Sequence, residues 1–123
     1  MQYDFSFLND EPTKRAFTAD EVIFKEGETG EEMYYIISGE VEIAVAGKVM
    51  EVIQAEGIIG EMALIDNSPR SATATARTDA TLAVIDQDRF TALLQQTPLF
   101  AIQVMRILAR RLRRSDSRIA FLE

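Results

Sequence analysis

The sequence contains no cysteine and no histidine among its 123 residues. Without cysteine, a disulfide framework, an iron–sulfur cluster and a thiolate nucleophile are excluded. Without histidine, Ser-His and Cys-His hydrolases are excluded, and a zinc or iron site would have to be built from carboxylates alone. The sequence therefore predicts no catalytic residues, no metal and no cofactor, and we expect no enzyme activity.

Long apolar runs are missing as well. No stretch approaches the roughly 18 consecutive apolar residues that a membrane-spanning helix needs. The first twelve residues, MQYDFSFLNDEP, are acidic and lack a basic region followed by an apolar one. We therefore expect no membrane span, no signal peptide and a cytoplasmic location.

Positive charge is scarce except at the C-terminal end. The net charge is −7, with seven Lys or Arg against eighteen Asp or Glu in residues 1–105 and six Arg against two acidic residues in 106–123. Cationic side chains near the end of a helix are favourable against the helix dipole. An acidic body opposes binding of a polyanion, so we expect no direct nucleic-acid binding.

The length suits one domain with a single core, so residues 1–123 are expected to form one domain. Short runs of alternating apolar residues fill residues 15–86, separated by Gly, Asp and Asn. Within "VAGKV", Gly47 can take the positive φ of a tight hairpin turn. Eight short strands at this spacing predict a mainly β fold, an eight-stranded antiparallel jelly-roll β-barrel. The predicted strands are Arg15–Thr18, Val22–Phe24, Glu32–Ser38, Val41–Val45, Lys48–Ile53, Ile58–Ile59, Ala72–Arg77 and Thr81–Ile85.

The apolar period changes in the last third of the chain, which predicts two helices over about residues 87–120. Asp86 or Asp88 can cap a first helix that runs to about Gln96, and Pro98 separates it from a second helix starting near Leu99. The second helix carries an apolar stripe at steps of four and three: Ala101, Met105, Leu108, Leu112, Ser115, Ile119 and Leu122. This stripe either packs on the barrel or forms the seam of a homodimer.

The segment "GEMALIDNSPRSAT", residues 60–73, is the part of the sequence that suggests chemistry. Gly60 lets the backbone turn, and one helical turn after it would leave N–H groups directed at an anion. Arg70 can grip two oxygens of a phosphate. Glu61 would repel a bare anion, so the ligand must also offer donors such as sugar hydroxyls. A nucleotide whose phosphate is fused to its ribose offers both.

The stretch "IIGEMALIDNSPRSATATA" resembles the phosphate-binding cassette of cyclic nucleotide-binding domains. These domains occur in catabolite-activator-type regulators, kinase regulatory subunits and cyclic nucleotide-gated channels. The stretch "EVIFKEGETGEEMYYIISGEVEI" (21–43) resembles the strand–loop–strand signature of the same family, and the likeness covers about residues 15–114. It implies that the last helix is a lid over the ligand.

The resemblance also implies roles for single residues. Glu61 would accept a hydrogen bond from the ribose 2′-hydroxyl, and Arg70 would pair with the cyclic phosphate. Backbone N–H groups near Ala63 and at Ser71 and Ala72 would bind the remaining phosphate oxygens. The implied ligand-binding set is Ile53, Ile59, Gly60, Glu61, Met62, Ala63, Arg70, Ser71 and Ala72, with Ile53 and Ile59 beside the base.

Two departures from the family pattern affect the wall of the pocket. Ile59 replaces the usual aromatic residue, and Ala55-Glu56-Gly57 replaces the usual Pro-Gly-Asp. In the family, Thr after the Arg favours cGMP and Ala favours cAMP. Ser71 lies between the two, and we expect cAMP to be preferred.

The sequence thus predicts a cyclic nucleotide sensor whose C-terminal helix caps the ligand, with Arg106, Arg110 or Arg111 touching the base. One alternative is the effector part of a catabolite-activator-type transcription regulator that lacks its DNA-binding domain. Another is an interaction scaffold of the same fold that binds no nucleotide. The presence of both Glu61 and Arg70 argues against the scaffold.

Overall fold

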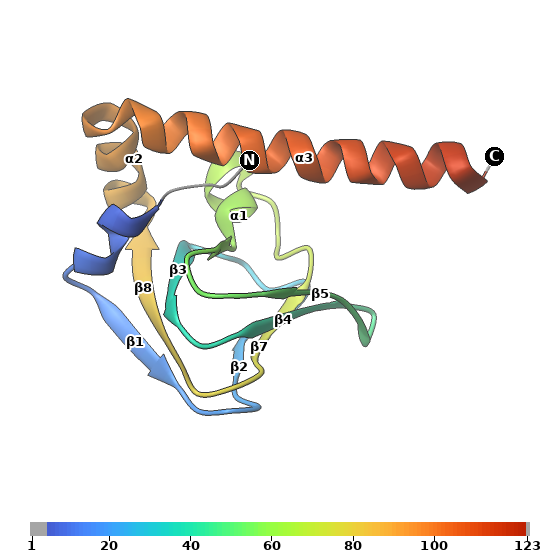
Figure 1. The fold of residues 1–123 in the computed structure, drawn as a ribbon, viewed down its shortest axis with the longest axis horizontal. Helices are drawn as coiled ribbons and strands as arrows, with labels where there is room; N and C mark the ends of the chain where they lie inside the picture. Colours follow the sequence, from blue (N-terminus) through green and yellow to red (C-terminus); the bar gives the residue numbers. More distant parts are fainter. Residues whose placement is uncertain (1–4, 123) are drawn as a thin grey trace. The chain divides into compact units, whose positions relative to one another are not determined.

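The computed structural model describes the backbone of residues 5–122 and the side chains of residues 5–113. Figure 1 shows the order of the elements along the chain. They are η1 (Ser6–Asp10), β1 (Lys14–Phe17), β2 (Val22–Phe24), β3 (Glu32–Ser38), β4 (Val41–Val45), β5 (Lys48–Ile53), β6 (Ile58–Ile59), α1 (Glu61–Asp66), β7 (Thr73–Ala76), β8 (Ala80–Asp86), α2 (Gln87–Gln96) and α3 (Pro98–Leu122).

The chain divides into two compact units, with the break between Phe90 and Thr91. All eight strands and α1 belong to the first unit, and α3 belongs to the second.

The strands form two antiparallel four-stranded sheets, in the orders β1-β8-β3-β6 and β2-β7-β4-β5 (Figure 1). Two packed sheets of this kind are the arrangement of a jelly roll. The antiparallel, mainly β prediction is confirmed. The described residues form two four-stranded sheets, each with its own two edge strands, and not a single closed barrel.

The apolar alternation located the strands well. The five strands from β2 to β6 have the predicted bounds, and β1, β7 and β8 differ by one residue at each end. Between β4 and β5, Ala46 and Gly47 have φ values of 53° and 81°, as the predicted tight hairpin turn requires. Asp86, and not Asp88, caps α2, because its Oδ1 accepts a hydrogen bond from the N–H of Arg89 at 2.8 Å.

The core of the first unit lies between the two sheets. Ile36, Val41 and Leu82 are fully buried there. Core residues alternate along a strand, as its two-residue period requires: Tyr34 and Ile36 on β3, and Ala80, Leu82 and Val84 on β8. Ala74 and Ala76 on β7 are also fully buried. Burial of these side chains supplies most of the stability of this unit at about 25 cal/mol per Å² of apolar surface.

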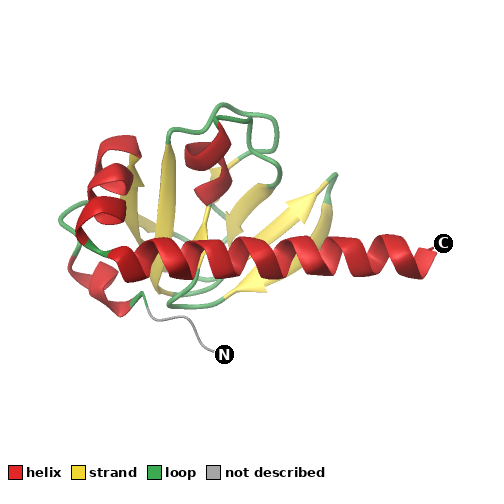
Figure 2. Cartoon of the chain, turned by 90° about the horizontal axis from the view of Figure 1, so that it is seen from above, coloured by secondary structure: helices red, strands yellow, loops and turns green. Residues whose placement is uncertain are grey.

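In the second unit, α3 is one long unbroken helix (Figure 2). It starts at Pro98, where a proline is well tolerated because the first N–H groups of a helix have no partner within it. On the predicted stripe, Met105 and Leu112 are exposed. The side chains of Ser115, Ile119 and Leu122 lie outside the described part. Among the described residues, no helix is both long and apolar enough to cross a membrane.

Candidate ligand-binding site

The segment between β6 and β7 forms a compact turn around one short helix. Gly60 takes a left-handed conformation with φ of 77°, and α1 follows it directly. Asn67 ends the helix in the same left-handed region, with φ of 57°, and its N–H donates to the carbonyl of Ala63 at 3.1 Å. The predicted helical turn is therefore present and extends two residues further, to Asp66.

The link from α1 to Arg70 is held by the side chain of Asp66. Its Oδ1 accepts hydrogen bonds from the backbone N–H of Ser68 at 3.0 Å and from the Ser68 hydroxyl. These hydrogen bonds lower the pKa of Asp66 below its ordinary value. The turn reverses the chain after α1, so that Arg70 lies just before β7.

The backbone of Arg70 is paired with the loop that follows β2. Its N–H donates to the carbonyl of Glu28, and its carbonyl accepts from the N–H of Gly27, both at 2.8 Å. The next strand, β7, pairs with β2 in antiparallel register. The position of Arg70 is thus set by the sheet and does not depend on the turn alone.

The guanidinium of Arg70 is buried, with only 6% of the residue exposed. Its Nη1 donates to the carbonyl of Gly60 at 3.0 Å and its Nη2 to the carbonyl of Glu32 at 2.7 Å. Its Cζ lies 4.1 Å from the centre of the Phe24 ring. Burial lowers the pKa of Arg70, which still remains protonated at neutral pH. Both of these hydrogen bonds go to neutral carbonyls, so they orient the positive charge without neutralising it.

Two glycines make room for this guanidinium. A Cβ on Gly30 would lie 2.5 Å from the Cζ and the Nε of Arg70, and a Cβ on Gly60 would lie 2.6 Å from its Nη1. Gly60 also needs its positive φ. Gly30 is therefore required for space, whereas Gly60 is required for both space and backbone conformation.

The other predicted partner of the ligand, Glu61, is the first residue of α1 and is only 1% exposed. A carboxylate in the first turn of a helix is favoured by the helix dipole. Its charge is close enough to Arg70 to oppose the fall of the Arg70 pKa, although burial has the larger effect. The structure therefore brings the two predicted ligand residues to the same end of the sheets.

The remaining predicted residues differ in exposure. Ala63 and Ala72 are buried, Ser71 is exposed, and Met62 is 42% exposed. Ile53 is half-buried against the core, and Ile59, at 2% exposed, is part of the core itself. Arg106, Arg110 and Arg111 lie on α3, in the second unit, and their predicted contact with the base stays a prediction.

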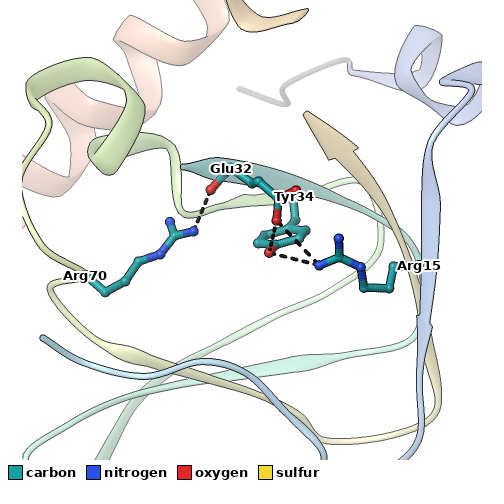
Figure 3. Close-up of polar contacts among 4 residues, drawn as sticks. All are labelled: Arg15, Glu32, Tyr34 and Arg70. Atoms are coloured by element: carbon teal, nitrogen blue, oxygen red, sulfur yellow. Dashed lines mark hydrogen bonds and ion pairs between the residues drawn. The ribbon is translucent and has the colours of Figure 1, made fainter. Parts of the chain in front are cut away.

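A network of polar side chains lies beside Arg70 (Figure 3). The hydroxyl of Tyr34 donates to Oε1 of Glu32 at 2.9 Å, and Nη1 of Arg15 lies 3.5 Å from that same oxygen. Glu32 thus holds Tyr34 with its side chain and Arg70 with its carbonyl. Sequence reasoning missed Glu32 and Phe24, because a backbone acceptor and an aromatic neighbour have no signal in the residue pattern.

This network predicts that the protein becomes less stable at alkaline pH, through the side chain of Tyr34. Burial, together with the hydrogen bond to Glu32, raises the pKa of Tyr34 above its ordinary value. Because the pKa of Tyr34 is higher in the folded state than in the unfolded state, its contribution to the free energy of unfolding is fully present below pH ~10. That contribution is lost as the pH rises further. We expect the free energy of unfolding, measured by urea titration, to fall above pH ~10 and to fall less steeply in Tyr34→Phe. Identical slopes in the two proteins would contradict this assignment.

A pocket of about 820 Å³ adjoins the network. Its lining is mainly polar or charged and comes from β1, β2 and the loop after it, β3, α1 and the turn after it, the end of β8 and the start of α2. Of the ligand-binding residues predicted from the sequence, Arg70 lines this pocket, and the others are absent from its described lining. Arg70 therefore forms part of the pocket wall, although it belongs to the segment between β6 and β7.

A substitution at Gly30 tests whether ligand binding needs the observed orientation of Arg70. In Gly30→Ala the new methyl group must push the guanidinium aside, and we expect binding of the cyclic nucleotide predicted from the sequence to weaken about tenfold, the loss of roughly one charged hydrogen bond. The affinity is measured by isothermal titration calorimetry.

The matched control is Gly47→Ala, whose Cβ would touch nothing within 4 Å but whose φ is 81°. This variant should lose about 1–2 kcal/mol of stability and keep its affinity. The same affinity in Gly30→Ala as in the unchanged protein would show that the guanidinium does not need its observed position.

Known proteins resemble this chain over most of its length. Residues 14–97 match the cyclic nucleotide-binding domain family. A CRP-like cAMP-activated global transcriptional regulator of Mycobacterium tuberculosis is 33% identical over 111 residues, which cover 86% of this chain and 50% of that protein. The cyclic AMP receptor protein of Thermus thermophilus is 31% identical over 114 residues, covering 89% of this chain and 53% of the relative.

The fold has a solved counterpart in the catabolite activator protein of Thermus thermophilus, with a TM-score of 0.86 and 29% identity over 95% of this chain and 57% of that one. The chain therefore belongs to the cyclic nucleotide-binding domain family, whose ligands are cyclic nucleotides. It spans about half the length of the two curated regulators.

Proposed function

We propose that this domain is a sensor that binds a cyclic nucleotide, cAMP in preference to cGMP, through the segment between β6 and β7. The observation that carries the proposal is the state of Arg70, whose buried guanidinium is held by two neutral carbonyls. A buried charge of this kind is stabilised when an anion binds to it. The cyclic phosphate is an anion that fits the matched family.

In this proposal the two buried charges bind different parts of one ligand. Arg70 pairs with the phosphate, and backbone N–H groups near Ala63 and at Ser71 and Ala72 bind its other oxygens. Glu61 accepts a hydrogen bond from the ribose 2′-hydroxyl. Ile53 and Ile59 lie beside the base.

The preference for cAMP is supported by one observation, because Ser71, at the position after the arginine, is intermediate between the residues associated with each nucleotide. The names of both curated regulators above refer to cAMP.

Calorimetric titration with cAMP, cGMP and 5′-AMP tests the function. A ligand of about 22 heavy atoms at roughly 0.3 kcal/mol per atom gives about −7 kcal/mol, so we expect a Kd for cAMP in the micromolar range. We expect a larger Kd for cGMP and the largest for 5′-AMP, whose phosphate is not closed onto the ribose. Absence of binding by either cyclic nucleotide at millimolar concentration would leave the non-binding scaffold as the better explanation.

We further propose that α3 acts as the lid, with Arg106, Arg110 or Arg111 against the base, and that the exposed Met105 and Leu112 contribute to a homodimer. A lid that closes on the ligand is a two-state element, which a sensor requires. Sedimentation velocity with and without cAMP measures the dimer. The cytoplasmic location stays a prediction.

A second candidate function is the effector part of a catabolite-activator-type transcription regulator. It is favoured by the likeness to the two bacterial regulators, of which the matched region covers about half. Such a regulator needs a recognition element in addition to the domain described here. Because the recognition element is additional to this domain, the electrophoretic mobility assay with duplex DNA, with and without cAMP, needs a protein that carries both. DNA binding that depends on cAMP would support the second candidate, and DNA binding that ignores cAMP would count against it.

A further inference from the structure

We propose that Phe24 is a positioning residue: its ring holds the Arg70 guanidinium in the orientation that binds the phosphate. The part of this inference that concerns phosphate binding, its ligand half, rests on the proposed function. The observation behind it is the stacking of the guanidinium on the ring, with Cζ 4.1 Å from the ring centre. This distance lies within the range of a cation–π interaction.

The sheet register places the ring under the guanidinium. Phe24 ends β2 and pairs with Ala74 on β7, and Arg70 lies just before β7 on the same chain segment. The backbone of Arg70 is bonded to Gly27 and Glu28, which follow β2. Two segments that are 46 positions apart, at Phe24 and Arg70, are thus fixed side by side by main-chain hydrogen bonds.

The ring is itself supported from the opposite sheet. Phe24 and Tyr34 are stacked, with ring centres 6.2 Å apart and planes inclined by 21°. Tyr34 donates to the side chain of Glu32, and the carbonyl of Glu32 accepts from Arg70. The contacts therefore form a closed ring of four residues: Arg70, Phe24, Tyr34 and Glu32.

An aromatic ring suits this position better than a carboxylate would. The N–H donors of a guanidinium lie in its plane, so a ring that covers one face leaves the edge to the carbonyls and to the ligand. The negative face of the ring stabilises the buried cation without forming an ion pair that a phosphate would have to displace. Phe24 thus lowers the cost of burying Arg70 and keeps its charge available.

The first test observes the unliganded protein. We expect the Nε–H proton of Arg70 to show an upfield ring-current shift in a ¹H–¹⁵N NMR spectrum. The shift should disappear in Phe24→Leu, which keeps an apolar side chain without a ring, and persist in Phe24→Tyr, which keeps the ring. Urea unfolding of each variant establishes that it is folded.

The second test uses the Sp and Rp phosphorothioates of cAMP, in which sulfur replaces one or the other exocyclic phosphate oxygen. In Phe24→Leu we expect cAMP to bind about fivefold more weakly, which is the size of a partly buried cation–π contact. The ratio of the Kd values of the two phosphorothioates should move toward one, because the guanidinium is no longer directed at one oxygen. Phe24→Tyr should keep the ratio of the unchanged protein.

These tests distinguish failure of the positioning role of Phe24 from failure of the proposed function. An unshifted Nε–H signal in the unchanged protein, or a Phe24→Leu variant that binds both phosphorothioates in the original ratio, would overturn the positioning role. If the unchanged protein binds no cyclic nucleotide, the proposed function and the ligand half of this inference fail together. The ring-current shift then still decides whether Phe24 positions Arg70.

Discussion

Replacing Arg70 by alanine is expected to weaken cAMP binding about 100-fold, because the phosphate loses two charged hydrogen bonds worth about 3 kcal/mol together. The side chain is already ordered by Gly60, Glu32 and Phe24 before any ligand arrives. Little side-chain entropy is then lost on binding, so nearly the full interaction energy contributes to affinity. Isothermal titration calorimetry with cAMP measures the effect.

Arg70→Lys separates the effect of the positive charge from the effect of the hydrogen-bond geometry of the guanidinium. A lysine keeps the positive charge but cannot reach two carbonyls and a phosphate with one ammonium group, so we expect a loss of tenfold or more. The matched control is Arg77→Ala, which removes an exposed arginine directly after β7, at the opposite end of that strand from Arg70, and should leave the affinity unchanged. An Arg70→Ala variant that is folded in urea titration and binds cAMP normally would remove the basis of the proposed function.

Replacing Glu61 by glutamine is expected to weaken cAMP binding about tenfold, a smaller loss than at Arg70, and Glu61→Ala somewhat more. The glutamine is nearly isosteric in this fully enclosed position, so packing changes little. It removes the charge that strengthens the hydrogen bond from the ribose 2′-hydroxyl. The sensitive measurement is the difference in affinity between cAMP and 2′-deoxy-cAMP.

In the unchanged protein, deletion of the 2′-hydroxyl should cost about 30-fold, the value of a hydrogen bond to a charged group. In Glu61→Gln the same deletion should cost about threefold or less, since the charged acceptor has gone. Glu56→Gln, which alters an exposed glutamate before β6, serves as the control and should behave as the unchanged protein. A 2′-hydroxyl effect of equal size in both proteins would show that Glu61 does not contact the sugar.

The strands were predictable because each carries its own signal. Alternation of apolar residues marks one face, and glycine marks the turns, as at Gly47 between β4 and β5. These signals are local, so they gave the five strands from β2 to β6 with their observed bounds. The arrangement into two separate sheets depends on which edges pair, and no single strand contains that information.

The site was predictable only in part for the same reason. Glu61 and Arg70 were found because a carboxylate and a guanidinium have distinctive chemistry and occur at a family spacing. The surroundings of Arg70 come from a distant part of the chain: the carbonyl of Glu32 is 38 positions away. This contact joins β3 of one sheet to the segment before β7 of the other, so it follows from the packing of the two sheets and leaves no pattern along the sequence.

The contacts of Arg70 have a consequence for the order of folding. Its backbone is hydrogen-bonded to the loop after β2, and Phe24 ends β2, whereas the carbonyls that it binds come from β3 and from the residue after β6, in the other sheet. Contacts between segments far apart in sequence have a larger loop-closure cost and form late in folding. A half-folded chain with only one sheet would therefore have no phosphate site, and a nucleotide could rescue only molecules that have nearly finished folding.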